Sequence, residues 1–266
     1  MSTGANNLSH VHKELINLLI TIDRICRENN IKYALHGGTL LGAERNGKLI
    51  PWDEDADISM HRSEFEKMQA IQKNLPYKIE ASELAPWLTS FCMYNTDGSK
   101  TSIDVFIWDY ISESKKLQAV KINVLRLIQG MMKKNIDYSE YTVIQKILVF
   151  ITHLFGLPFS ENMKRKMYNK VSRDVLIGNR TFIHRSNDAY VGVSYVFDAE
   201  YMNSYTDIKL EGSLFMVPKR YKEFLVRNYG KDYMTPPKEK DRKAEHGHDK
   251  AFLPESERGG LFSVRR

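Results

Sequence analysis

The sequence predicts an α+β fold, in which a small mixed β-sheet is flanked by helices and an additional helical region lies in the middle of the chain. Two observations predict it. Short segments of alternating polarity occur within residues 32–109, as expected for half-buried strands, and three successive helical patterns occur within residues 115–176. A chain of 266 residues is long enough to bury a sizeable core of this kind.

The first part of the chain, residues 1–112, is expected to form the core of the fold. Apolar side chains recur at helical spacing over about 9–29, which predicts an amphipathic helix. Residues 32–36 are then expected to form a short strand that runs into Gly37-Gly38. Those glycines open a short helix over 39–45.

The segment from Asp55 to Met60 alternates between polar and apolar residues. This period of two predicts a half-buried strand whose open face carries Asp55 and Asp57 side by side. Ser63 and Glu66 have the spacing of a capping box and predict the start of the next helix.

Further strands are expected over 77–80, 88–94 and 102–109. In the last of these, the apolar residues share one face and Asp104 lies on the opposite face. Asp104 is therefore expected to come from a strand next to the one that carries Asp55 and Asp57.

Residues 113–185 are expected to form a basic helical subdomain, with helices over about 115–134, 139–155 and 160–176. Residues 186–266 are expected to complete the core and to end in a polar tail. Within them, 187–194 and 214–217 have the character of extended segments, and 218–229 that of a helix ending at Gly230.

The distribution of charge separates the middle of the chain from the rest. Residues 113–185 hold 14 Lys and Arg against 5 Asp and Glu, a balance of +9, so that the net charge of +6 leaves −3 for the remainder. Such a region could hold phosphates or lie against an anionic membrane, and it could equally be a solvated helix face. No nucleic-acid partner is expected.

Cysteine content and hydropathy favour a reducing, cytoplasmic setting. The two cysteines, Cys26 and Cys92, lie in apolar surroundings and are expected to be buried thiols. The first ten residues lack the pattern of a signal peptide, and the longest apolar stretch, 143–158, is interrupted and shorter than a membrane span.

Three acidic residues, Asp55, Asp57 and Asp104, are the candidate catalytic and metal-binding residues. Two aspartates two positions apart on a strand project together, and a third from a neighbouring strand completes a set of hard oxygen ligands. Magnesium, or manganese in its place, is the expected ion, because it neutralises phosphate charge in group transfer.

Gly37, Gly38 and Thr39 are the candidate phosphate-binding residues. Two glycines at a strand-to-helix junction allow backbone N–H groups to approach a phosphate, and the start of the following helix favours its charge. Arg45 could reach the same phosphates. Asp53 could bind the metal or orient the loop.

Two candidates remain open on the residues alone. Glu211 could approach the site, or it could have a turn or packing role. His246 and His248 could suggest a metal pair, although histidines in a polar tail are usually solvated.

Several segments resemble the LicD family of phosphocholine transferases and the related fukutin-related phosphotransferases. The resemblance is most specific at 33–45 (YALHGGTLLGAER) and 50–58 (IPWDEDADI). It continues at 102–106 (SIDVF), 210–218 (LEGSLFMVP) and 221–237, and no part of 111–185 takes part in it. Where this chain has Asp53-Glu54 and Leu49, family members often have Asp-Asp and an aromatic residue.

The resemblance implies a nucleotidyltransferase-like fold and a magnesium-dependent transfer of phosphocholine, or a related phospho-alcohol. The implied donor is CDP-linked, most simply CDP-choline, the acceptor is a sugar hydroxyl of a glycan or glycolipid, and CMP is released. Asp55 and Asp57 would hold the metal, and Asp104 would share it and accept the proton of the hydroxyl. His246 falls where the family often has a histidine.

Two rival interpretations stay open. The same carboxylates would serve an enzyme that transfers a whole nucleoside monophosphate and releases pyrophosphate. In the second interpretation, the chain is a non-catalytic partner that docks to a membrane or an enzyme through the basic region. The intact Asp55, Asp57 and Asp104 argue against it.

Overall fold

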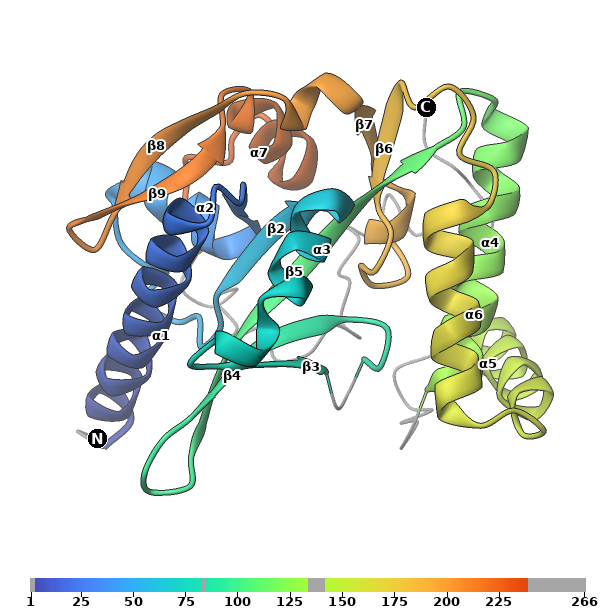
Figure 1. Ribbon diagram of the computed structural model, residues 1–266, viewed down its shortest axis with the longest axis horizontal. Coiled ribbons are helices and arrows are strands. Elements are labelled where there is room, and N and C mark those ends of the chain that lie inside the picture. The colour runs from blue at the N-terminus through green and yellow to red at the C-terminus, as the bar shows by residue number, and fades with distance from the viewer. Residues whose placement is uncertain (1–2, 83–84, 134–141, 239–266) are drawn as a thin grey trace. The chain divides into compact units, whose positions relative to one another are not determined.

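The computed structural model describes residues 3–82, 85–133 and 142–238, and these form two compact units (Figure 1). The first unit is drawn from residues 3–80, 90–107 and 200–238. The second is drawn from the described residues of 81–89 and 108–199. The fold is α+β with a mixed sheet, as the sequence predicts. The predicted boundaries at 112 and 185 stay a prediction.

The first unit is built on strands that follow one another in the sheet in the order β1-β2-β5-β4-β3. β1 pairs antiparallel with β2, with Ala34 opposite Ser59. The strands are β1 (Ala34–Leu35), β2 (Asp57–His61), β3 (Lys78–Ala81), β4 (Thr89–Tyr94) and β5 (Lys100–Ile111).

Helices and one hairpin accompany these strands in the first unit. The helices are α1 (Thr3–Glu28), α2 (Gly37–Asn46), α3 (Arg62–Ala70), the 3-10 turn Gln72–Asn74 and α7 (Tyr221–Tyr229). The hairpin, β8 (Tyr205–Leu210) and β9 (Ser213–Pro218), packs against β1, α2 and α1 (Figure 1). α1 buries the apolar face that the sequence predicts, including Leu18, Leu19 and Ile22, and this burial holds the helix in place.

The second unit combines the end of β5 with three helices. Trp108 to Ile111 of β5 pair antiparallel with β6 (Phe182–Arg185), which pairs antiparallel with β7 (Val196–Asp198). The helices are α4 (Lys115–Met132), α5 (Val143–Gly156) and α6 (Glu161–Asp174), with a 3-10 turn at Gly192–Ser194; a further 3-10 turn, Ala199–Met202, begins at the last residue of this unit and continues into the first. α5 and α6 both pack against α4. The three helices confirm the predicted helical region.

The interior of the second unit is unusually polar. The Lys121 ammonium is fully buried and donates to the carbonyls of Tyr110 and Ser172, at 2.9 and 2.7 Å. The buried Asp109 carboxylate accepts from the Ser186 hydroxyl at 2.5 Å. Because a buried charge is costly without partners, these bonds constrain how the helices and strands of this unit can pack.

Three local predictions are wrong. β2 begins at Asp57, so Asp55 lies in the irregular segment before the strand. α3 is capped by the His61 side chain, which accepts from the backbone N–H of Ser63 in place of the predicted capping box. Residues 187–194 are a loop and a 3-10 turn, and the strand lies at 182–185.

Both cysteines are buried and free, which confirms the expected thiols. No helix in the part of the chain that the structure describes combines the length and apolar character needed to cross a bilayer. The predicted polar tail lies outside the described residues after 238, as do His246 and His248.

Candidate active site

The Gly37-Gly38 turn joins β1 to α2 and faces two carboxylates. Gly37 has φ of +51°, a conformation that favours glycine. A Cβ atom on Gly37 would lie closer than 3.0 Å to Asp57 Oδ2, and one on Gly38 would lie 2.5 Å from Asp53 Oδ2. The absence of side chains at both positions therefore lets the carboxylates of Asp53 and Asp57 approach the backbone of the turn.

The main chain of Asp57 is held on both sides by the residues around this turn. The His36 N–H donates to the Asp57 carbonyl at 3.0 Å. The Asp57 N–H donates to the Thr39 hydroxyl oxygen at 2.8 Å, and Thr39 is buried. Thr39, which was predicted to bind phosphate, thus has a contact that fixes the start of β2.

The acidic segment before β2 is anchored through the backbone of Asp53. The Asp53 N–H donates to the Ile50 carbonyl at 3.0 Å, closing a turn. The Nε2 atom of His12, on α1, lies 2.7 Å from the Asp53 carbonyl oxygen. Asp55 follows in the same segment and is half-buried. The start of this segment is therefore held by α1, and its end is held by the residues around the Gly37-Gly38 turn.

Asp104 lies on β5 beside this segment. Its N–H donates to the carbonyl of Ala56, the residue between Asp55 and Asp57, at 3.1 Å. Its Oδ1 atom accepts from the hydroxyl of Ser90, on β4, at 2.5 Å. The structure thus brings the backbone of Asp104 next to the Asp55–Asp57 segment and gives its carboxylate a fixed partner.

The carboxylate oxygens of the site are of the kind that a hard cation binds, but they are not arranged as a complete metal site. Within residues 3–82, 85–133 and 142–238, no group of three or more His, Cys, Asp or Glu side chains is arranged to hold a metal ion. What fits magnesium is the chemistry of the donors, because Asp53 and Asp57 present carboxylate oxygens at a glycine turn that a phosphate could approach. The metal roles of Asp55, Asp57 and Asp104 remain predictions.

Arg45 is directed toward residues 233–235, which follow α7. Its Nε donates to the Tyr233 carbonyl at 2.6 Å, and its Nη2 donates to the Thr235 carbonyl at 3.1 Å. Burial lowers the pKa of Arg45 from its ordinary value. These two bonds fasten residues 233–235 to the end of α2, whereas the sequence suggests a contact with phosphate.

Glu211 holds the loop that leads into the acidic segment. It occupies the two-residue turn of the β8–β9 hairpin with φ of +47°. Its N–H donates to the Gly47 carbonyl at 2.8 Å, and its Oε1 atom accepts from the Leu49 N–H at 3.2 Å. Of the two roles that the sequence leaves open, these contacts correspond to the turn role.

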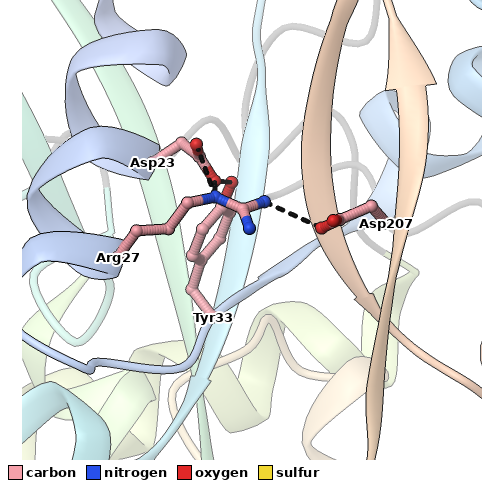
Figure 2. A network of polar contacts seen from close by, with 4 residues as sticks. All are labelled: Asp23, Arg27, Tyr33 and Asp207. Carbon is pink, nitrogen blue, oxygen red and sulfur yellow. Dashed lines mark hydrogen bonds and ion pairs between the residues drawn. The ribbon is translucent and has the colours of Figure 1, made fainter.

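A polar network attaches this hairpin to α1, as Figure 2 shows. Arg27 bonds to the Asp23 carboxylate at 2.9 Å and, through Nη2, to Asp207 of β8 at 2.7 Å. The Tyr33 hydroxyl donates to Asp23 at 2.8 Å, and burial raises the pKa of Tyr33 so that it remains a donor. Through Asp207, the network fixes the strand that precedes Glu211.

Residues 30–142, which include the Gly37-Gly38 turn, the acidic segment and Asp104, match the family model described as "LicD/FKTN/FKRP, nucleotidyltransferase domain". This match identifies residues 30–142 as a LicD-family domain. The α+β fold with its mixed sheet is consistent with the nucleotidyltransferase-like fold of this family.

Similarity to one LicD-family protein extends over most of the chain. The lipopolysaccharide cholinephosphotransferase LicD of Haemophilus influenzae (strain Rd) is 28% identical over 87% of this chain and 92% of its own length. An uncharacterized protein of Rickettsia prowazekii is 36% identical over 57% of this chain and 63% of its own length. Human ribitol 5-phosphate transferase FKRP is 52% identical over 12% of this chain and 6% of its own length.

His12 and Ser90 are two site residues that sequence reasoning misses. Both lie in segments without a recognisable motif, and their contacts join residues 41 and 14 positions apart. A polar residue within a helix or strand pattern gives no sign of the distant segment that it will meet.

Proposed function

We propose that this chain transfers phosphocholine, or a related phospho-alcohol, from a CDP-linked donor to a sugar hydroxyl of a cell-surface glycan, releasing CMP. The main observation that supports this proposal is that the carboxylates of Asp53 and Asp57 lie against the Gly37-Gly38 turn. The similarity to a lipopolysaccharide cholinephosphotransferase over most of both chains supports the choice of phosphocholine and of a lipopolysaccharide-type acceptor. The proposed reaction takes place in the cytoplasm.

The reaction is a displacement at the phosphorus of the transferred group. The sugar oxygen forms a bond to that phosphorus, the bond to the CMP oxygen breaks, and the hydroxyl proton leaves with a base. Magnesium, held by Asp55 and Asp57 with Asp104 sharing it, would neutralise charge on the donor phosphates. The backbone of the glycine turn would position the donor.

Asp104 is the proposed base. Its Oδ1 atom accepts from the Ser90 hydroxyl, which fixes the orientation of the carboxylate that would receive the proton. Thr39 and Glu211 would act through the backbone, because their observed contacts hold Asp57 and Leu49. Arg45 would act by holding residues 233–235.

A donor screen tests the proposal. The purified chain is incubated with CDP-choline, CDP-ethanolamine, CDP-glycerol or CDP-ribitol, each with magnesium and a lipopolysaccharide acceptor, and nucleotides are separated by chromatography. We expect CMP from one donor and none in the presence of a chelator. Release of pyrophosphate from CTP, without CMP from any CDP-linked donor, would instead indicate nucleotidyl transfer and overturn the proposal.

A matched pair of variants controls the screen. Asp57→Asn should lower CMP formation by roughly a thousandfold, while Asp97→Asn should leave it unchanged. Asp97 is an exposed aspartate in the turn between β4 and β5, where it accepts from Ser99. Equal activity of the two variants would contradict a role for the acidic segment. No CMP from any donor, with folded wild-type protein, would favour the non-catalytic interpretation.

A further inference from the structure

Helix α5 of the second unit presents apolar side chains to solvent. Val143, Ile147, Phe150 and Leu154 have exposed fractions of 73, 54, 58 and 54%. Their spacing of four, three and four residues places them on one face of the helix. Ile151 and Phe155 extend the same exposed stripe. Large exposed apolar patches of this kind are rare on monomeric proteins and mark a surface that meets something else.

The inward side of α5 explains why the apolar residues point outward. α5 packs against the end of α4 through small residues. A Cβ atom on Gly130 would lie closer than 3.0 Å to Thr152, and one on Gly156 would lie 2.8 Å from the Met131 carbonyl oxygen. The two helices therefore approach closely at Gly130 and Gly156, and the exposed apolar residues of α5 lie on its outer side.

Helix α4 carries a second exposed apolar stripe. Leu117, Val120, Val124 and Leu127 follow one another at helical spacing, and each is more than a third exposed. Leu127 lies one turn before Gly130, the residue that contacts α5. We call the exposed side chains of α4 and α5 together the apolar helical face: Leu117, Val120, Val124, Leu127, Val143, Ile147, Phe150, Ile151, Leu154 and Phe155.

Positive charge is concentrated on the three helices of the second unit. α6 holds five Lys and Arg against two acidic residues, α5 holds one Lys and no acidic residue, and α4 begins with the exposed Lys115-Lys116. Leu157 and Met163, before and at the start of α6, are also exposed. Apolar side chains combined with Lys and Arg are typical of helices that lie in the interface of an anionic bilayer.

We propose that the apolar helical face docks on the surface of an anionic lipid bilayer, with Phe150 and Phe155 entering the acyl boundary and the α6 cations meeting lipid phosphates. Charge complementarity favours this partner over a second copy of the chain, which would bring the same positive charge. The described helices do not span a bilayer, so the contact is peripheral. The inference goes beyond the proposed activity and is tested without turnover.

Vesicle sedimentation tests the proposal with the full chain. Vesicles of phosphatidylcholine alone are compared with vesicles in which about a third of the lipid is phosphatidylglycerol, because surface charge sets the attraction of basic residues. We expect binding to the anionic vesicles that weakens as salt is raised. Equal binding to neutral vesicles, or none to either, would overturn the proposal.

Matched variants separate the apolar and electrostatic contributions. Phe150→Ser and Phe155→Ser should each weaken binding roughly tenfold, as expected for withdrawing an inserted aromatic side chain. Leu214→Ser, on β9 and exposed to the same 58% as Phe150, should leave binding unchanged. Lys166→Glu with Lys170→Glu should weaken it by roughly tenfold or more, whereas Lys13→Glu with Lys73→Glu, with the same net charge, should not.

Direct insertion and self-association are distinguished by two further measurements. Fluorescence of a Phe155→Trp variant should be quenched by brominated lipid in anionic vesicles, beyond the quenching of wild-type protein. Light scattering without lipid should report the same mass for wild-type protein and Phe155→Ser. A dimer that Phe155→Ser dissociates, with no quenching by lipid, would assign the face to a second copy and overturn the proposal.

Discussion

The two units of the chain use polar groups in opposite ways. In the first unit, side chains such as Thr39 and Glu211 bond to backbone groups of the segments around Asp57, and carboxylates face a glycine turn. In the second unit, Asp109 and Lys121 are buried and bonded within the interior, while apolar side chains face solvent. We infer that polar residues in the first unit prepare a site, and that those in the second unit specify packing.

The strongest test of this difference is one substitution made in each unit. Asp57→Asn should lower turnover by roughly a thousandfold with little change in thermal stability, because it removes charge where donor phosphates would be neutralised. Asp109→Asn should lower the free energy of unfolding by about 1–3 kcal/mol and leave turnover per folded molecule unchanged, because it weakens a buried bond to Ser186. Turnover and urea denaturation of both proteins are the measurements. Similar behaviour of both variants would remove the distinction.

Added methyl groups at two glycines should show the same contrast with a smaller effect. Gly38→Ala places a Cβ atom 2.5 Å from Asp53 Oδ2 and should reduce kcat/KM by roughly a hundredfold, because small displacements at a reacting centre are costly. Gly130→Ala places a Cβ atom against Thr152 and should cost about 1–3 kcal/mol of stability by overpacking. Donor titrations would measure the loss of activity in Gly38→Ala, and melting curves would measure the loss of stability in Gly130→Ala. Undiminished activity of Gly38→Ala would speak against a donor site at the turn.

Glu211 should have an intermediate effect that identifies it as a positioning residue. Glu211→Ala removes the acceptor for the Leu49 N–H and should reduce kcat/KM roughly tenfold through loss of orientation. Glu211→Gln keeps an acceptor oxygen and should restore most of the activity. Steady-state kinetics of the two variants distinguish a positioning role from a charge-dependent role in substrate binding. A charge-dependent role would leave Glu211→Gln as impaired as Glu211→Ala.

A separate expected effect is on alkaline stability, and it reports on the first unit because both cysteines lie there. Burial raises the pKa of Cys92 from 9.0 to about 11, and that of Cys26 further. The folded chain therefore retains protons that the unfolded chain releases, and stability present below pH 9 is lost as the pH rises toward 11. The slope should approach about −1.4 kcal/mol per pH unit for each thiol. Urea denaturation of wild-type protein and Cys92→Ala between pH 8 and pH 11 measures it, and identical slopes would contradict it.

Periodic segments were predicted well from the sequence, because repeated apolar positions report directly on a buried face. α1, α4 and α6 lie within a few residues of their predicted ranges, except that α1 begins earlier. β6 was missed because His184 and Arg185 are buried through hydrogen bonds and an ion pair to Asp188, so that polarity does not alternate along it. Burial of polar residues depends on partners that no local pattern identifies.

The candidate site shows the same limit. The Gly37-Gly38 turn and the acidic segment form a local motif, and the sequence locates both. The contacts of Arg45, Glu211 and His12 join segments up to 190 positions apart, and their geometry follows from how the hairpin, α1 and residues 233–235 pack. Residue types suggested phosphate contacts for Arg45, whereas the fold directs it to backbone carbonyls.

The turn at Glu211 carries a further consequence. Glu211 and Gly212 have φ of +47° and +86°, a pair of conformations for which Asn-Gly is the preferred hairpin sequence. Asparagine would relieve the strain of a glutamate there, by about 1 kcal/mol, but its shorter side chain would not reach the loop at Leu49. Laboratory evolution that rewards only heat resistance should therefore drift to asparagine at 211 and yield sturdier proteins that work more slowly.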